Sequence, residues 1–174
     1  FSSPKRHRHA LVNALSEKSP YMAFSPPVSL FSSFLKVVDA GLVILSQQRI
    51  VETRFLEYES TDWIDRFVCK GALAAKFADG SWIVNTHIQS NYCQTSSVKV
   101  QNQQFLQLSN FIQNELKSPL KCTLVGDLNL DFLTEISRFR SIEGLFKRNN
   151  GLVCCLRNSL FQPTTLDGKR LDYI

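Results

Sequence analysis

The stretch KCTLVGDLNLD (residues 121–131) determines how the rest of the chain is interpreted. A short apolar run ends at Gly126, and a carboxylate and a carboxamide follow it two residues apart, which is how a buried strand ends at a polar site. Because glycine has no Cβ, Gly126 indicates that another group approaches the backbone closely there. We expect Asp127 and Asn129 to share one face at the carboxyl end of this strand, where α/β folds usually place their chemistry.

The clearest hairpin in the chain lies upstream, on either side of Asp79-Gly80. Residues 68–78 (VCKGALAAKFA) and 81–88 (SWIVNTHI) flank this dipeptide. Asp-Gly is the short turn expected between two antiparallel strands. The second arm ends in Asn-Thr-His, so His87 also lies at a strand end.

Helices are predicted around the central strand. After a polar loop over residues 89–97, apolar residues recur at the 3, 4, 4 spacing of an amphipathic helix, which Ser118-Pro119 ends. These residues are Phe105, Leu108, Ile112 and Leu116. Residues 133–146 also have helical character. After the Asp167-Gly168 turn, residues 170–174 are predicted to begin a final strand.

The first third of the chain is less regular. Ser2-Ser3-Pro4 predicts a helix that runs to about Lys18, and its basic first turn is either a phosphate-contacting patch or a solvated face. Residues 19–36 mix serine and proline with aromatic residues, so we interpret them as a loop that either dips into a membrane interface or packs across a sheet edge. Strands are expected over residues 41–46 (GLVILS) and 49–58.

Composition limits the possibilities further. The 174 residues, 44% of them hydrophobic, suit one domain with a proper core, and a net charge of +5 with a pI near 9.0 favours an anionic partner. We expect neither a transmembrane helix nor a signal peptide. An odd number of cysteines without a CxxC spacing argues against a zinc site and favours buried thiols. These cysteines are Cys69, Cys93, Cys122, Cys154 and Cys155.

A set of short motifs, taken in chain order, resembles the endonuclease/exonuclease/phosphatase superfamily. The motifs are GLVILS (41–46), KGAL (70–73), NTHI (85–88), GDLN (126–129) and DGKRLDYI (167–174). That superfamily consists of magnesium-dependent phosphodiesterases and phosphatases, including DNase I-like nucleases and neutral sphingomyelinases. Asp62-Trp63 with Lys70-Gly71, the THIQS segment (86–90) and residues 97–104 are most similar to the sphingomyelinase-like branch. The resemblance implies an α/β fold, namely a DNase I-like two-sheet sandwich of mixed sheets flanked by helices.

The resemblance also implies roles for individual side chains in phosphodiester hydrolysis. Asp127 would serve the attacking water and Asn129 would donate to the phosphoryl group, and both are candidate ligands of Mg²⁺ or another divalent cation. His87 would contact the phosphate, and Asp172 would orient a catalytic histidine. Ordinary structural roles stay open beside these: a turn aspartate, a helix-capping asparagine or a strand-end histidine bonded to backbone. Lys70 would either favour an anionic substrate or be a solvent-exposed strand lysine.

Parts of the family pattern have no counterpart in the sequence. The family has a metal-binding Asn on an early strand, a metal-binding Glu before the first helix and a Ser-Asp-His motif after the LDYI strand. We therefore expect residues 1–174 to be the central part of a single catalytic domain, incomplete at both termini. Such a fragment should be inactive or very feeble alone, because the members of a catalytic constellation act as a unit.

The sequence thus predicts a metal-dependent phosphodiester hydrolase, expected to be a monomer. The substrate is expected to be a sphingomyelin-type phospholipid, with residues 21–35 as a candidate for contact with the membrane surface. One alternative is a nuclease of the same fold with nucleic acid as partner, although the loop over residues 89–97 has no Lys or Arg. The other is an inactive binding module that keeps the fold. The cellular location is not determined by these patterns.

Overall fold

The computed structural model describes residues 10, 12–15, 18–27, 38–59, 61, 67–91, 94–116, 121–131, 134–151 and 172–173. Their strands are β1 (Tyr21–Phe24), β2 (Val43–Ser46), β3 (Ile50–Glu57), β4 (Gly71–Phe77), β5 (Trp82–His87), β6 (Cys122–Asp127) and β7 (Asp172–Tyr173). Their helical elements are α2 (Gln94–Asn110), a π-helical turn η1 (Phe111–Glu115) and α3 (Ile136–Asn150). Within these residues, no helix is long and apolar enough to cross a membrane.

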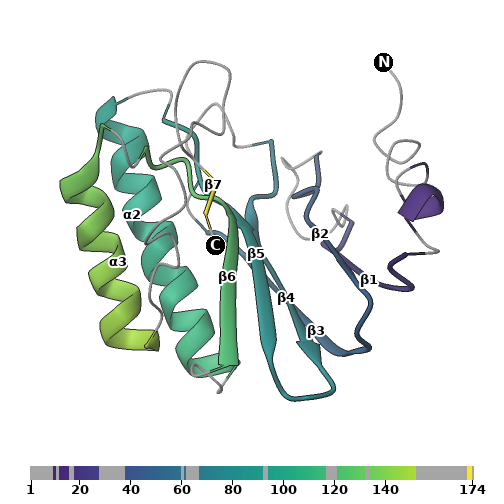
Figure 1. Ribbon diagram of the computed structural model, residues 1–174. Coiled ribbons are helices and arrows are strands. Elements are labelled where there is room, and N and C mark those ends of the chain that lie inside the picture. The colour runs from purple at the N-terminus through teal and green to yellow at the C-terminus, as the bar shows by residue number, and fades with distance from the viewer. Residues whose placement is uncertain are drawn as a thin grey trace.

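The strands form two sheets that pack against each other. The larger has the order β3-β4-β5-β6-β7 and the smaller is the pair β1-β2. In the larger sheet β5 and β6 are parallel and the other neighbours are antiparallel, so it is a mixed sheet. Figure 1 shows α2 and α3 on one face of this sheet and β1-β2 on the other. The structure confirms the expected α/β architecture of packed sheets flanked by helices.

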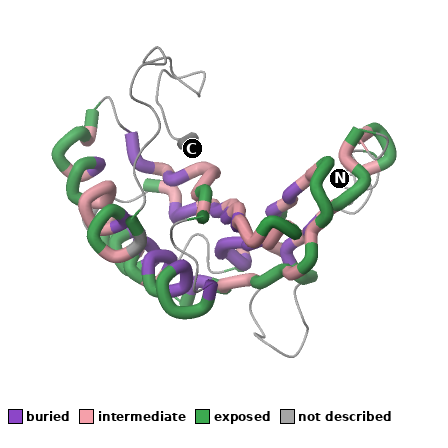
Figure 2. The backbone as a smooth tube through the Cα atoms, turned by 60° about the horizontal axis from the view of Figure 1, so that its bottom comes forward, coloured by how far each residue is buried: buried purple, intermediate pink, exposed green. Residues whose placement is uncertain are grey.

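Each face of the larger sheet has its own apolar core. The helix-side core joins β4, β5 and β6 to α2, η1 and α3, and its large members include Trp82, Phe105, Leu108, Ile112 and Phe146. The rings of Phe105 and Phe146 meet edge to face with centroids 6.3 Å apart, which fixes α3 against α2. In Figure 2 the buried residues of both helices gather on the sides that face the sheet.

The second core lies between the two sheets and consists of Ala23, Leu42, Ile44, Leu73 and Ala75. Strand β4 contributes alternate residues to the two cores, so it is buried on both sides along most of its length. This double burial explains why its sequence, GALAAKF, is a continuous apolar run rather than an alternating one. The predicted hairpin is confirmed, with β4 and β5 antiparallel on either side of Asp79-Gly80.

Alternation along β5 decides which side chains face which layer. Trp82 and Val84 lie in the helix-side core, whereas Ile83 packs on the core beneath β1-β2. Asn85 points the same way as Ile83, because its Nδ2 donates to the carbonyl of Val43 in β2 at 3.0 Å. His87, two residues further on, shares that face.

The structure corrects several predicted boundaries. Residues 19–36 were expected to be a loop, yet 21–24 form β1, which pairs with β2 and buries Ala23. The loop expected over 89–97 is wrong in its second half, because α2 begins at Gln94. Helix α3 begins and ends a few residues later than expected. Of the predicted first helix, residue 10 and residues 12–15 are helical, and its remainder is largely outside the described residues, as are residues 152–171.

Two cysteines lie within the described part of the chain. Cys69 is buried and Cys122 is half-buried. This agrees with the expected buried thiols for these two residues. Cys93, Cys154 and Cys155 lie outside the described residues.

Candidate active site

The site is built where the parallel strands β5 and β6 end. Their register pairs His87 with Asp127, so these two chain-distant residues are neighbours at the same sheet edge. His87 Nε2 lies 3.7 Å from Asp127 Oδ2, with side chains 44% and 32% exposed. A histidine and a carboxylate at this distance, both reached by solvent, can exchange protons with a bound substrate or water and can share a charge.

Gly126 makes this pairing possible. Its φ is +127°, and a Cβ built on it would lie 2.1 Å from the carbonyl oxygen of Thr86 and 2.9 Å from the Thr86 nitrogen. The predicted close approach is therefore confirmed, and the approaching group is the backbone of β5. Any side chain here would separate β5 from β6 one residue before His87 and Asp127.

Asn129 lies in a turn and not on the strand. Strand β6 ends at Asp127, and Asn129 has a φ of 47°. Its backbone N–H donates to Asp127 Oδ1 at 2.8 Å, and its Nδ2 donates to the carbonyl of Ile88 at 2.9 Å. The expectation that both side chains share one face of a strand is wrong. They are brought together instead by a left-handed turn that the Asp127 carboxylate stabilises.

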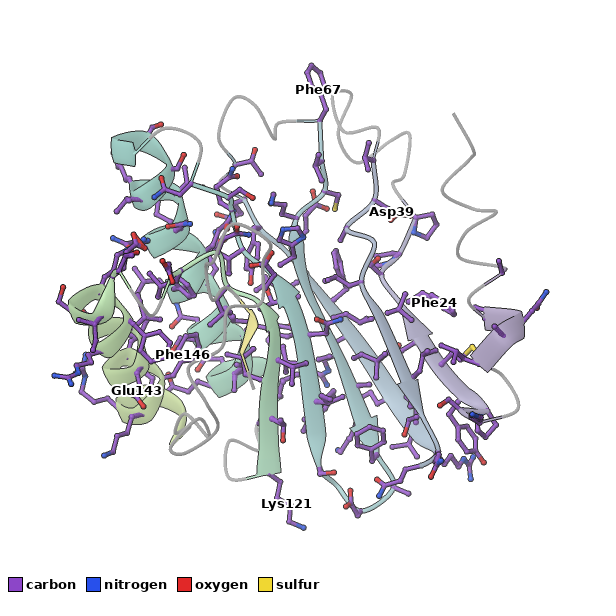
Figure 3. All side chains as sticks on the ribbon, turned by 45° about the horizontal axis from the view of Figure 1, so that its top comes forward. Phe24, Asp39, Phe67, Lys121, Glu143 and Phe146 are labelled. Carbon is purple, nitrogen blue, oxygen red and sulfur yellow. The ribbon has the colours of Figure 1, made fainter. Side chains whose placement is uncertain are left out.

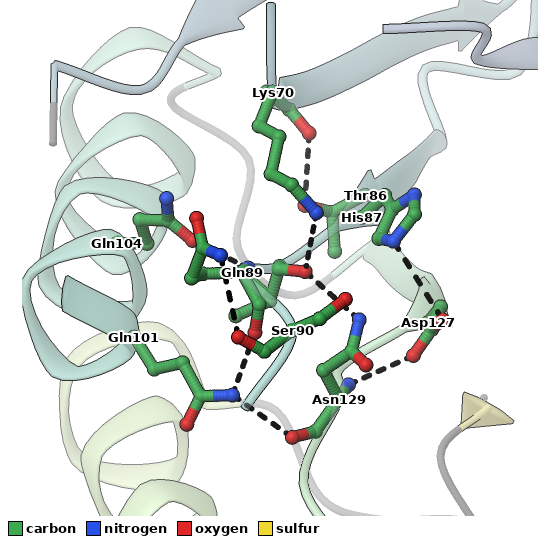
Figure 4. A network of polar contacts seen from close by, with 11 residues as sticks. Lys70, Thr86, His87, Gln89, Ser90, Gln101, Gln104, Asp127 and Asn129 are labelled. Atoms are coloured by element: carbon green, nitrogen blue, oxygen red, sulfur yellow. Dashed lines mark hydrogen bonds and ion pairs between the residues drawn. The ribbon is translucent and has the colours of Figure 1, made fainter. Parts of the chain in front are cut away.

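Lys70 adds a buried cation beside these groups. It precedes β4, is 5% exposed, and its Nζ donates to the carbonyl of Ile88 at 3.3 Å. Figure 4 shows Lys70, His87, Asp127 and Asn129 arranged around the segment that follows β5. The solvent-exposed reading of Lys70 is wrong. A buried ammonium needs negative or dipolar partners, and the Ile88 carbonyl is one of them.

The pairing of β7 with β6 brings Asp172 to the same region. Strand β7 is antiparallel to β6, and the register pairs Asp172 with Asp127. The backbone thus brings the fourth predicted residue to the strand that carries Asp127. Its side chain is outside what the structure describes, and its role toward a histidine stays a prediction.

A group of buried glutamines lies behind the site, and none of them is among the residues predicted from the sequence. Gln89, Gln101 and Gln104 have no exposed surface, and the two on α2 bond the backbone of Gln89. Their signal was present in the sequence. Ser97, Gln101, Gln104, Leu108 and Ile112 follow one helical stripe at spacings of 4, 3, 4 and 4, in which the first members are polar.

Oxygen ligands are available for a magnesium ion. The Asp127 carboxylate and the amide oxygen of Asn129, whose Nδ2 is directed at Ile88, are hard donors of the kind Mg²⁺ prefers. Among the residues described, no group of three or more His, Cys, Asp or Glu side chains could hold a metal ion. Mg²⁺ is usually bound through one or two protein groups, with water and substrate oxygens completing its shell, and the oxygens of Asp127 and Asn129 are donors of that kind.

Comparisons with known proteins agree on the fold. No family model and no curated protein matches the sequence. Among solved structures, SmcL superposes with a TM-score of 0.73 and 21% identity over 95% of this chain and 64% of its own. A mutant of beta toxin from Staphylococcus aureus with bound magnesium ions gives 0.72 and 20% over 95% and 64%. Sphingomyelinase C from Streptomyces griseocarneus gives 0.60 and 20% over 79% and 51%.

These likenesses identify the fold as DNase I-like, the fold of the endonuclease/exonuclease/phosphatase superfamily. Within that fold, this chain is similar to SmcL, beta toxin and sphingomyelinase C. It spans 64% or less of the length of these three structures. At about 20% identity the similarity is one of fold, so the activity must be argued from the site.

Proposed function

We propose that this chain belongs to a metal-dependent phosphodiester hydrolase. The observation that carries the proposal is the parallel register of β5 and β6. It places His87 Nε2 3.7 Å from Asp127 Oδ2 at a solvent-accessible edge of the sheet. The buried ammonium of Lys70 beside this pair favours an anionic substrate. An acid–base pair next to a buried cation suits the cleavage of a phosphate ester.

In-line attack on a phosphodiester needs an oriented water, compensation of the charge on the phosphoryl oxygens, and a proton for the leaving oxygen. In the proposed mechanism Asp127 orients or deprotonates the water, and His87 contacts the phosphate. Asn129 Nδ2 has two hydrogens, so it can donate to a phosphoryl oxygen while it keeps its bond to Ile88. A magnesium ion held by Asp127 and Asn129 would supply charge neutralisation at the phosphoryl oxygens.

For the substrate, we infer a sphingomyelin-type phospholipid presented by a membrane surface. One support is the likeness to sphingomyelinase C. Another is apolar surface at the end of the molecule where the site lies. Val38 and Phe67 are 47% and 40% exposed, and a hydrogen bond from Val38 N to Phe67 O joins them. In Figure 3 Phe67 projects at the end of the molecule opposite Lys121, which precedes β6. The apolar pair thus lies toward the end where β6 finishes and the site begins.

Residues 21–35 were predicted to contact the membrane surface, but the first of them lie away from the site. Tyr21 and Met22 line a groove of about 450 Å³ together with residues 50–53 at the start of β3. Because β3 begins opposite the last residue of β4, this groove is at the end of the sheet remote from His87. Tyr21 is therefore not part of the proposed lipid contact. Residues 28–35 are outside the described part of the chain.

The test uses the full-length protein and measures hydrolysis of sphingomyelin in detergent micelles and of plasmid DNA in parallel, each with magnesium and with EDTA. We expect magnesium-dependent loss of sphingomyelin alone. Cleavage of DNA alone would move the protein to the nuclease alternative. No hydrolysis of either by the folded full-length protein would leave a phosphatase of soluble substrates or a binding module.

A variant pair assigns any activity to this site. Asp127→Asn keeps an oxygen that can accept the Asn129 N–H but removes the negative charge. We expect it to lower turnover by several powers of ten without unfolding the chain. Glu115→Gln, which removes an exposed carboxylate of η1, is the matched control and should leave turnover unchanged. Near-normal turnover in Asp127→Asn would reject the catalytic role of Asp127.

A further inference from the structure

Gln101 of α2 is fully buried, and its amide group is engaged at both ends. Its Nε2 donates to the carbonyl of Gln89 at 2.6 Å and to the carbonyl of Asn129 at 2.9 Å. Its Oε1 accepts a hydrogen bond from Arg138 Nη2 of α3 at 2.5 Å. One side chain thus contacts the segment after β5 and the turn after β6 (Figure 4), and it also contacts α3 through Arg138.

The chemistry of the partners determines which way this amide points. Backbone carbonyls only accept hydrogen bonds, and a guanidinium only donates them. The amide nitrogen must therefore face the two carbonyls and the amide oxygen must face Arg138. Arg138 is itself fixed by an ion pair with Glu135 at 3.3 Å and a bond to Asn102 at 3.3 Å, so α3 holds Gln101 in its donating orientation.

The two backbone segments that Gln101 joins carry the groups of the proposed active site. Gln89 is two residues beyond His87, and its N–H donates to Gln104 Oε1 at 2.8 Å, so α2 holds both backbone groups of Gln89. Asn129 is two residues beyond Asp127 and occupies a left-handed turn, a conformation that asparagine adopts more readily than most residues and that hydrogen bonds support. Gln101 supplies that support at the Asn129 carbonyl.

We propose that Gln101 is a positioning residue of the active site: it ties the ends of β5 and β6 to α2 and keeps the Asn129 amide and His87 in their mutual alignment. This inference rests on the proposed hydrolase function. Gln101 does not touch the reacting atoms and acts through the two backbone carbonyls. Loss of its donors removes a hydrogen bond from the buried Gln89 carbonyl and from the half-buried Asn129 carbonyl, so the turn relaxes toward water and the amide of Asn129 moves.

Two substitutions separate this role from simple packing. Gln101→Met keeps the length of the side chain but loses every hydrogen bond. Gln101→Glu keeps an acceptor for Arg138 but presents oxygens instead of donors to the two carbonyls, so it loses only the contacts that the proposal invokes. Gln103→Met, at an exposed position of the same helix, is the matched control.

In the full-length protein we expect both Gln101 variants to lower kcat by roughly 10- to 100-fold, with KM changed less than about threefold, and Gln103→Met to match the parent. Amide hydrogen exchange supplies a readout independent of turnover. Exchange at Gln89 and Asn129 should rise about tenfold or more in both Gln101 variants, while exchange within β4 stays unchanged.

Contrary results are equally specific. Parent-like kcat and parent-like exchange in Gln101→Glu would overturn the proposal, because that variant lacks the donors and retains the Arg138 contact. If Gln101→Met does not fold, Gln101→Glu and the more conservative Arg138→Lys decide the same question, the latter with a smaller rise in exchange. If the full-length protein hydrolyses neither substrate, the proposed function fails separately, and exchange alone then supports or overturns the positioning role.

Discussion

The substitution Gly126→Ala tests how closely β5 and β6 must approach at the site. A Cβ at this position would lie 2.1 Å from the Thr86 carbonyl oxygen and 3.0 Å from Asn85 Oδ1. The first of these atoms belongs to the backbone of a central strand, so it cannot rotate away as the end of a side chain could. The strands must separate, or the backbone of Gly126 must leave its φ of +127°.

The expected cost has two parts. Holding alanine at a φ of this kind costs about 1–3 kcal/mol. Separating the strands around residues 85–87 and 125–127 weakens two or three ladder hydrogen bonds, at about 1 kcal/mol each. The sum is roughly 3–6 kcal/mol, a large share of the ~5–15 kcal/mol that stabilises a typical domain.

Gly80→Ala is the matched control for the part of the cost that comes from placing alanine at a positive φ. Gly80 also has a positive φ, +83°, but a Cβ there meets no atom within 4 Å. It should therefore cost only about 1–2 kcal/mol. Urea unfolding of the parent and of both variants gives the loss of unfolding free energy for each substitution. The difference between the two losses measures the clash of the Cβ at position 126 with β5. Equal destabilisation by the two substitutions, within about 0.5 kcal/mol, would refute the reasoning that strand approach is limiting at Gly126.

Other residues give shorter tests. Asp127→Ala should be about 1 kcal/mol less stable than Asp127→Asn in urea unfolding, because only the alanine variant leaves the Asn129 N–H without its acceptor. Burial raises the pKa of Cys122 to about 12, so mass-mapped alkylation of this thiol at pH 8 should be about a thousandfold slower in the folded chain than in urea, and equal rates would contradict it. Burial also raises the pKa of Tyr58 above its usual value near 10, so the stability that comes from keeping its proton is complete below pH 10 and is lost as the pH rises further. Between pH 10 and 12 the free energy of unfolding should fall more steeply in the parent than in Tyr58→Phe, by about 1.4 kcal/mol per pH unit, and parallel curves would exclude this linkage.

Much of the fold was accessible from local patterns. The hairpin around Asp79-Gly80 was predicted because turn chemistry and apolar runs of strand length are properties of adjacent residues. The end of β6 at a polar site was predicted from an apolar run, a glycine and a carboxylate, and Gly126 does accept the close approach of another backbone. The helix through Phe105 and Ile112 was predicted from its apolar period, and both residues are fully buried.

The wrong predictions have a common cause: the hydrogen-bond partners of these residues are distant in the sequence. The first turns of α2 were taken for a loop because their buried face is polar, and glutamines such as Gln101 are stable there only through bonds to backbone that is remote in sequence. Strand β1 was taken for a loop because its ladder partner, β2, lies about twenty residues further along. The sequence allowed two interpretations of Lys70, because the carbonyl that accepts its hydrogen bond belongs to Ile88, which is 18 residues away in the chain.

The sequence by itself determined the β4-β5 hairpin, the helix through Phe105, the strand-end positions of His87 and Asp127, and the need for a glycine at position 126. Each of these follows from residues close together in the chain. Only the tertiary structure decided that β5 and β6 pair in parallel, in a register that joins two residues forty positions apart. It also decided that Asn129 reaches the site through a left-handed turn and that Gln101 holds that turn. Contacts of this kind depend on the packing of the whole sheet and its helices, which no local pattern contains.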